Sequence, residues 1–137
     1  MTIERFGPPS PGPGGRAVPF TKAVRAGDFV FVSGQVPMGS DGEIVHGSIV
    51  EQTHQTVANI KSILADLDLG LEHVVKATVW LADTRDFWPF NKVYNEYFRS
   101  GPAGAFLRSR RHDGGLQGRD RGHRLRSEID ALFQPAG

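Results

Sequence analysis

The sequence predicts an α/β or α+β sandwich in which two helices cover one face of a sheet. Three observations support this: runs of alternating apolar and polar residues, two apolar stripes at helical spacing, and the alternation of strands with helices along the chain. The length of 137 residues suits one domain, and 39% apolar with 23% charged residues is ordinary for a globular protein.

The chain begins with a proline- and glycine-rich segment, residues 1–15, which we interpret as a flexible lead-in to a single domain at 16–137. The run GPPSPGPGG at 7–15 suits neither a helix nor a central strand, because proline lacks an amide hydrogen. Residues 17–24 then predict a first short strand, and RAGD predicts a turn.

The next strand is predicted at 29–37, where FVFVSGQVP is rich in β-forming residues. Ser33 and Gly34 interrupt this run and Pro37 stops it. A further short strand is expected around Ile44 and Val45.

The first helix has a clear start signal, since Ser48 and Glu51 form an S-x-x-E capping box. Apolar residues then recur at a period of about 3.6, which predicts one packed face. They are Val50, Val57, Ile60, Ile63, Leu64 and Leu67. Gly70 is expected to end the helix in the left-handed conformation.

A strand at 73–83, HVVKATVWLAD, follows the first helix. Its alternation puts Val75, Ala77, Val79 and Leu81 on one buried face. The two tryptophans, Trp80 and Trp88, are interpreted as packing residues, with an interface role as the alternative.

The second helix is predicted from Asp83 or Asp86 to about Arg99, with Pro89 tolerated in its first turn. Two amphipathic helices need more sheet than these strands supply. We therefore expect further strands after the second helix.

Composition excludes several classes of protein. A formal net charge of +1 offers no general attraction to nucleic acid or an anionic membrane. The absence of cysteine excludes disulfides, thiol catalysis and thiolate metal sites, and suits a cytoplasmic protein. The five histidines lack metal-binding spacing, so we expect no metal. No apolar run approaches the roughly 18 residues of a membrane span, and the N-terminus lacks the pattern of a secretory signal.

Four motifs resemble the Rid/YjgF family of reactive-intermediate (enamine/imine) deaminases. They are VSGQVP, EQTHQTVANIKSIL, VVKATVWLAD and DFWPFNKVYNEYF, and the resemblance extends over about 17–98. It implies an α+β, chorismate-mutase-like fold with two helices on one face of the sheet. It also implies a barrel-like homotrimer with a cleft between each pair of subunits.

The resemblance further implies a site for a small enamine or imine acid such as 2-aminoacrylate. In the family an arginine after the second helix holds the substrate carboxylate, and a glutamate on the last strand positions water. The SGQ turn and an early tyrosine line the cleft. Ser33 and Gly34 match the turn, and Phe20 stands at the tyrosine position without its hydroxyl. Ser33 is interpreted as a cleft-lining residue rather than a nucleophile.

The chain departs from the family after the second helix. Residues 106–127 carry seven arginines against Asp113 and Asp120, and the family's arginine motif is absent. The later run SEIDALFQP resembles the family's closing strand. In the chain as written, Glu128 then stands in the water-positioning place, and Arg108 or Arg110 is the nearest substitute for the carboxylate anchor. We take Arg108 and Glu128 as the candidate catalytic residues.

A shift of reading frame accounts for this departure. Permitted codons for 103–124, read one base later, encode ARSCVAAGMTVDCKVEIEVI, which has the family's arginine motif and final strand at the family's spacing. We therefore predict that residues 104 to about 127 are a frameshifted segment, in the gene or in the recorded sequence. An RNA-binding arm is the alternative, but Phe106 alone supplies none of the aromatic interleaving that single-strand binders use.

The resemblance implies hydrolysis of the enamine or imine to a 2-keto acid and ammonia, without a metal or organic cofactor. Two alternatives stay open: a non-catalytic trimeric module of the same fold that binds a small ligand, and an RNA-binding or ribonuclease-type member. Aminomuconate, aminoacrylate and branched imines all remain candidate substrates. The expected partners are a small-molecule ligand and two further copies of the chain, rather than membrane or nucleic acid.

Overall fold

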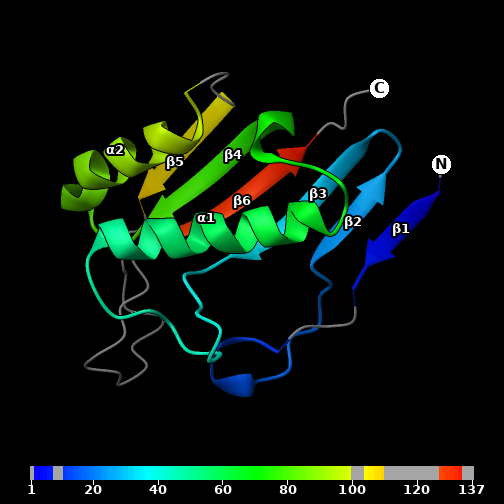
Figure 1. The fold of residues 1–137 in the computed structure, drawn as a ribbon, viewed down its shortest axis with the longest axis horizontal. Coiled ribbons are helices and arrows are strands. Elements are labelled where there is room, and N and C mark those ends of the chain that lie inside the picture. Colours follow the sequence, from blue (N-terminus) through cyan, green and yellow to red (C-terminus); the bar gives the residue numbers. More distant parts are fainter. Residues whose placement is uncertain (1, 8–10, 100–103, 110–126, 134–137) are drawn as a thin grey trace.

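A computed structural model describes residues 2–7, 11–99, 104–109 and 127–133, the last two ranges by their backbone. The described residues form one six-stranded sheet and two α-helices, both on the same face of the sheet (Figure 1). The strands are β1 (Ile3–Phe6), β2 (Ala23–Ala26), β3 (Phe29–Gln35), β4 (Val74–Leu81), β5 (Gly104–Ser109) and β6 (Ser127–Phe133). The helices are α1 (Ile49–Ala65) and α2 (Phe87–Tyr97), with short 3-10 turns at Pro13–Gly15, Leu71–His73 and Thr84–Asp86. The predicted α+β class is confirmed.

The strand order is β1-β2-β3-β6-β4-β5. β6 lies between β3 and β4 and is antiparallel to both, whereas β5 runs parallel to β4 at the edge (Figure 1). The strands expected after the second helix are therefore present. The SEIDALF segment becomes the strand that joins the two halves of the sheet.

The N-terminal part differs from the sequence prediction. Ile3–Phe6 forms β1, which pairs antiparallel with β2, so the predicted lead-in contains a strand. The first predicted strand, 17–24, begins only at Ala23, because Pro19 has no amide hydrogen for a ladder. Near Ile44 the chain makes a single bridge to Met38 rather than a strand.

Helix α1 begins as predicted, with the Ser48 N–H donating to the Glu51 carboxylate at 2.6 Å. Its buried face includes Val57, Ile60, Ile63 and Leu64, whereas Val50 is exposed. The predicted end at Gly70 is wrong. Gly70 has an extended φ of −132°, and Asp68 takes the left-handed conformation at φ 57°, which aspartate tolerates better than most residues.

Strand β4 presents a buried face to the helices. Ala77, Val79 and Leu81 are at most 2% exposed, as their alternation predicts. Val75 is instead 42% exposed, and Val74 takes the buried place. The register shift between Val74 and Lys76 against β6 is the cause, because an irregularity of this kind changes which side chains face the core.

Helix α2 begins at Phe87, with Asp86, one of the two predicted start residues, at its N-cap position. Asp83 instead caps the preceding 3-10 turn, where its carboxylate accepts a hydrogen bond from the Arg85 N–H at 2.9 Å. Pro89 lies in the first turn of α2 as expected. Trp88 is not a core residue, since it is 74% exposed and its ring contacts only the edge of Phe87 among the described aromatic pairs.

Candidate ligand-binding site at one end of the sheet

The two candidate catalytic positions lie on either side of one residue of β4. Trp80 pairs with Arg108 of the neighbouring β5 and with Glu128 of β6 on its other side. Adjacent strands are about 4.8 Å apart, so the backbone positions 108 and 128 are about 10 Å apart. The side chains at 108 and 128 lie outside the described atoms, as does the whole of Arg110. The register nevertheless brings together two positions that are twenty residues apart in the sequence.

The predicted turn residues Ser33 and Gly34 lie at the same end of the sheet. They fall within a register shift between β3 and β6, which begins at Val32 and ends where Gln35 pairs with Ile129. Ile129 follows Glu128 directly, so the irregular part of β3 borders the Glu128 position. Irregularities of this kind are common beside active sites, where they redirect side chains.

Ser33 is held by hydrogen bonds rather than poised as a nucleophile. Its Oγ donates to the Thr21 carbonyl at 2.6 Å, and its N–H donates to the Lys22 carbonyl at 3.0 Å. These bonds bring the segment containing Phe20, which is exposed, to the end of β3. The structure therefore brings Phe20, Ser33 and Gly34 into one neighbourhood, and the role of Ser33 as a lining residue stays a prediction.

The face of the sheet opposite the helices, which we call the open face, carries a group of exposed apolar side chains on its N-terminal strands. Phe29 and Phe31 of β3 and Ile3 of β1 are 39%, 48% and 52% exposed. Val24 and Ala26 of β2 are paired with the two phenylalanines, and Ile3 is paired with Ala26. An apolar area that extends across three strands is typical of a surface that binds a partner.

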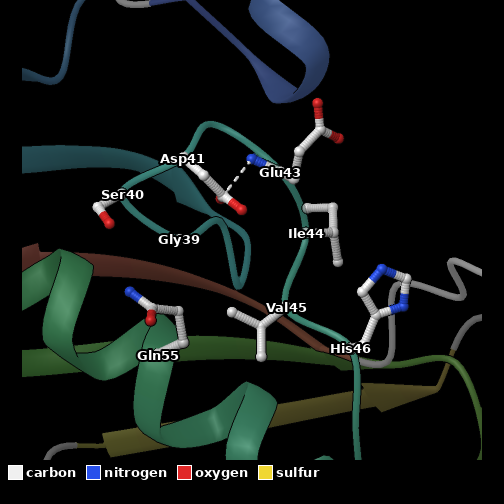
Figure 2. Close-up of a pocket in the computed structure, with 8 residues that line it drawn as sticks. All are labelled: Gly39, Ser40, Asp41, Glu43, Ile44, Val45, His46 and Gln55. Atoms are coloured by element: carbon white, nitrogen blue, oxygen red, sulfur yellow. Dashed lines mark hydrogen bonds between the residues drawn. The ribbon is translucent and has the colours of Figure 1, made fainter.

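A separate hollow of about 590 Å³ lies between the loop after β3 and helix α1 (Figure 2). The described residues that line it are Gly39, Ser40, Asp41, Glu43, Ile44, Val45, His46 and Gln55. None of the predicted site residues is among them. Two carboxylates, those of Asp41 and Glu43, line the hollow. Asp41 Oδ1 accepts a hydrogen bond from the Glu43 N–H at 3.0 Å, so the Asp41 carboxylate helps to order the loop.

Polar residues of α1 hold this loop against the helix. Asn59 Nδ2 donates to the carbonyls of Val36 and Met38, at 3.1 and 2.9 Å, and Gln52 Nε2 donates to the Val45 carbonyl at 3.0 Å. Sequence reasoning missed this role. The available signal was a series of polar residues on the buried face of α1, where a packed helix usually carries apolar residues. These residues are Gln52, Thr53 and Thr56.

Two tyrosines of α2 have shifted acidities. Burial raises the pKa of Tyr94, which stacks on Phe98 with ring centroids 4.5 Å apart. Burial, followed by the charge of Glu96, raises the pKa of Tyr97. The Tyr97 hydroxyl lies 2.6 Å from Nδ1 of His54, which links the two helices on the covered side of the sheet. We call the three paired positions Arg108, Trp80 and Glu128 the row. Neither tyrosine belongs to it.

The described residues contain neither a candidate metal site nor a candidate membrane span. No group of three or more histidine, aspartate or glutamate side chains among them could hold a metal ion. Neither described helix is long and apolar enough to cross a membrane.

The α+β sheet, its irregular β3 and the row at its end define a small protein of the Rid/YjgF class. Residues 14–111 match the family model described as Endoribonuclease L-PSP, and the chain belongs to this family. A RutC family protein of Pyrococcus abyssi is 48% identical over 87 residues, 62% of this chain and 68% of the relative. The yeast protein Mmf1, named as mitochondrial, is 42% identical over 84 residues, 61% of this chain and 58% of the relative.

Solved structures extend the likeness to the whole fold. A putative endoribonuclease of Thermotoga maritima has a TM-score of 0.80 at 30% identity, with 98% of this chain and 99% of the other covered. TdcF of Escherichia coli, solved with bound serine, has a TM-score of 0.77 at 25% identity, with coverage of 97% and 99%. The likeness of fold therefore also covers β6, which lies beyond the family match at 14–111, whereas β5 lies within that match.

Proposed function

We propose that this protein hydrolyses small enamine or imine acids to a 2-keto acid and ammonia. The observation that carries the proposal is the row at the end of the sheet. The Arg108 and Glu128 positions flank Trp80, and the Ser33–Gly34 irregularity borders Glu128. The serine bound to TdcF adds support, since it shows that one relative accommodates a small molecule with a carboxylate.

The chemistry that this row suits begins with a carboxylate held by an arginine, whose planar donors match it in a two-point hydrogen bond. The enamine carbon takes up a proton, and the resulting imine carbon becomes electrophilic. Water, oriented by the glutamate, adds to that carbon. The carbinolamine then expels ammonia and leaves the keto acid. The substrate is already activated, so the protein supplies position, exclusion of bulk water and a proton path.

The proposed assembly is a homotrimer, supported by the apolar open face. Ile3, Phe29 and Phe31 are costly to leave in water, at about 25 cal/mol for each Å² of apolar surface. A cleft between subunits would then complete the row with residues of a second copy. We also propose a cytoplasmic location, which the absence of cysteine supports, although the yeast relative is named as mitochondrial.

The main alternative is a binding module of the same fold without catalysis. The observation that favours it is the missing arginine motif in the chain as written. A ribonuclease-type role is suggested only by the description of the family model.

The deciding experiment is an ammonia-release assay. A serine dehydratase generates 2-aminoacrylate in the presence of the chain as written or of a chain with the frame restored. The restored chain is expected to accelerate ammonia release, with the chain as written near the uncatalysed rate. Calorimetric binding of a keto acid without acceleration in either chain would establish the binding module instead. Cleavage of a single-stranded RNA by the restored chain, with no effect on ammonia release, would favour the ribonuclease.

A further inference from the structure

We propose that Trp80 is the floor of the substrate site and gives it a preference for flat, conjugated acids over tetrahedral ones. This inference rests on the proposed function, to whose site it adds a residue with a stated role. From its sequence context alone, Trp80 is interpreted as a packing or interface residue. The register of the sheet and the burial of its neighbours give it a different role.

The side chain of Trp80 lies on the open face of the sheet. Its two neighbours in β4, Val79 and Leu81, are almost completely buried beneath the helices. Successive side chains of a strand project to opposite faces, so the indole of Trp80 faces away from the helices. It is half-buried there rather than fully covered.

The position of Trp80 within the row is central. On the β5 side its paired position is Arg108, and on the β6 side it is Glu128. In an enamine or imine acid the reacting carbon is bonded directly to the carboxylate carbon. A molecule whose carboxylate is held from position 108 and whose adjacent carbon receives water from position 128 therefore lies over position 80.

The chemistry of an indole favours a flat molecule at this place. An enamine or imine conjugated with a carboxylate is planar, and can lie parallel to the indole with all its heavy atoms in contact. A saturated amino or hydroxy acid is tetrahedral at the same carbon and holds one substituent away from the ring. Aromatic stacking contributes enough to give a preference of about tenfold for the planar acid.

Two matched ligands and two matched variants test this. Pyruvate and lactate have the same carbon skeleton, but only pyruvate is planar at the carbon beside the carboxylate. The protein has two tryptophans, and Trp88 is exposed on α2, outside the row. Trp88→Phe therefore leaves Trp80 as the only indole, and Trp80→Phe leaves Trp88.

Fluorescence titration and calorimetry then give separate answers for the chain as written. Pyruvate is expected to change the emission of the Trp88→Phe protein saturably and to leave that of the Trp80→Phe protein unchanged. Calorimetry of Trp88→Phe is expected to show pyruvate binding about tenfold tighter than lactate. Trp80→Leu should bring that ratio close to one, whereas Trp80→Phe, which keeps an aromatic ring, should retain most of it.

The inference is overturned if pyruvate binds Trp88→Phe by calorimetry without changing its emission. It is also overturned if pyruvate does not bind up to tens of millimolar, or if Trp80→Leu keeps the ratio. Should Trp80→Leu fail to fold by circular dichroism, the emission of Trp88→Phe alone decides. These outcomes are independent of the ammonia assay. The chain as written could lack deaminase activity and still bind pyruvate over Trp80, or it could be active and bind pyruvate elsewhere.

Discussion

The two faces of the sheet differ in what covers them. On the helix side, Val79 and Leu81 of β4 belong to the same buried core as Leu64 of α1, which is 0% exposed. On the open face, Phe29 and Phe31 remain in contact with solvent, and Trp80 lies between two charged positions. The first face is complete within one chain. The second face leaves apolar side chains exposed, and the proposed assembly and ligand would cover them.

Removal of Leu64, which is fully buried, should produce the largest effect. Leu64→Ala creates a cavity in the core between α1 and the sheet, and we expect the free energy of unfolding to fall by about 2–5 kcal/mol. Denaturant unfolding measures the loss. Val50→Ala, in the same helix but exposed, is the control and should cost well under 1 kcal/mol. Equal losses in the two variants would mean that α1 is not packed as described.

Restoration of the reading frame tests whether an arginine anchor for the substrate carboxylate is needed for activity. A two-point charged hydrogen bond to the carboxylate combines two contacts of about 1.5–3 kcal/mol each, so the restored chain should exceed the chain as written by two or more orders of magnitude. Ammonia release at equal folded concentration measures this.

Two arginine variants of the chain as written sharpen that comparison. Arg108→Ala should remove any residual activity, whereas Arg85→Ala, which removes an exposed arginine paired with Asp83, should not. Equal rates for the restored and written chains would show that the anchor is supplied elsewhere. The arginine assignment and the frameshift hypothesis would then both be withdrawn.

Loss of one aromatic ring from the open face should weaken the proposed trimer. Phe31→Ser removes apolar surface from that face. Light scattering should therefore show the variant dissociating toward the 15.0 kDa monomer at a higher protein concentration than the parent protein does. Val50→Ser, on α1, removes an exposed apolar side chain from the helix side and should leave assembly unchanged. A restored chain that is already a stable monomer would refute the trimer.

The smallest effect is expected from Tyr94→Phe. Among the described residues, the buried Tyr94 hydroxyl has no hydrogen-bond partner, so its removal should be neutral or should stabilise by up to about 1 kcal/mol at pH 7. Burial raises the Tyr94 pKa above its ordinary value of 10.0. The unfolded chain then releases its proton first, so stability should fall as the pH rises above about 10. The denaturant midpoint, measured from pH 7 to pH 11, should fall less with rising pH in Tyr94→Phe than in the parent protein.

The candidate site was only partly visible in the sequence. The motifs named Phe20, Ser33 and Gly34, and the closing segment named Glu128, by their likeness to a family. Their proximity depends on pairing between β3, β6, β4 and β5, and such pairing joins residues far apart in the chain. Trp80 had no signal of its own, since nothing local distinguishes a packing tryptophan from one between two site positions.

Local patterns by themselves determined α1 and most of β4. A capping box and a 3.6-residue period require neighbours only a few residues away, and so does the alternation through Ala77, Val79 and Leu81. The tertiary structure decided the rest. β1 is a strand because β2 offers it an edge, and Val74 rather than Val75 is buried because the ladder with β6 is irregular there. The insertion of β6 between β3 and β4 was settled in the same way, because hydrogen bonds between strands depend on which edges are available and on no local sequence period.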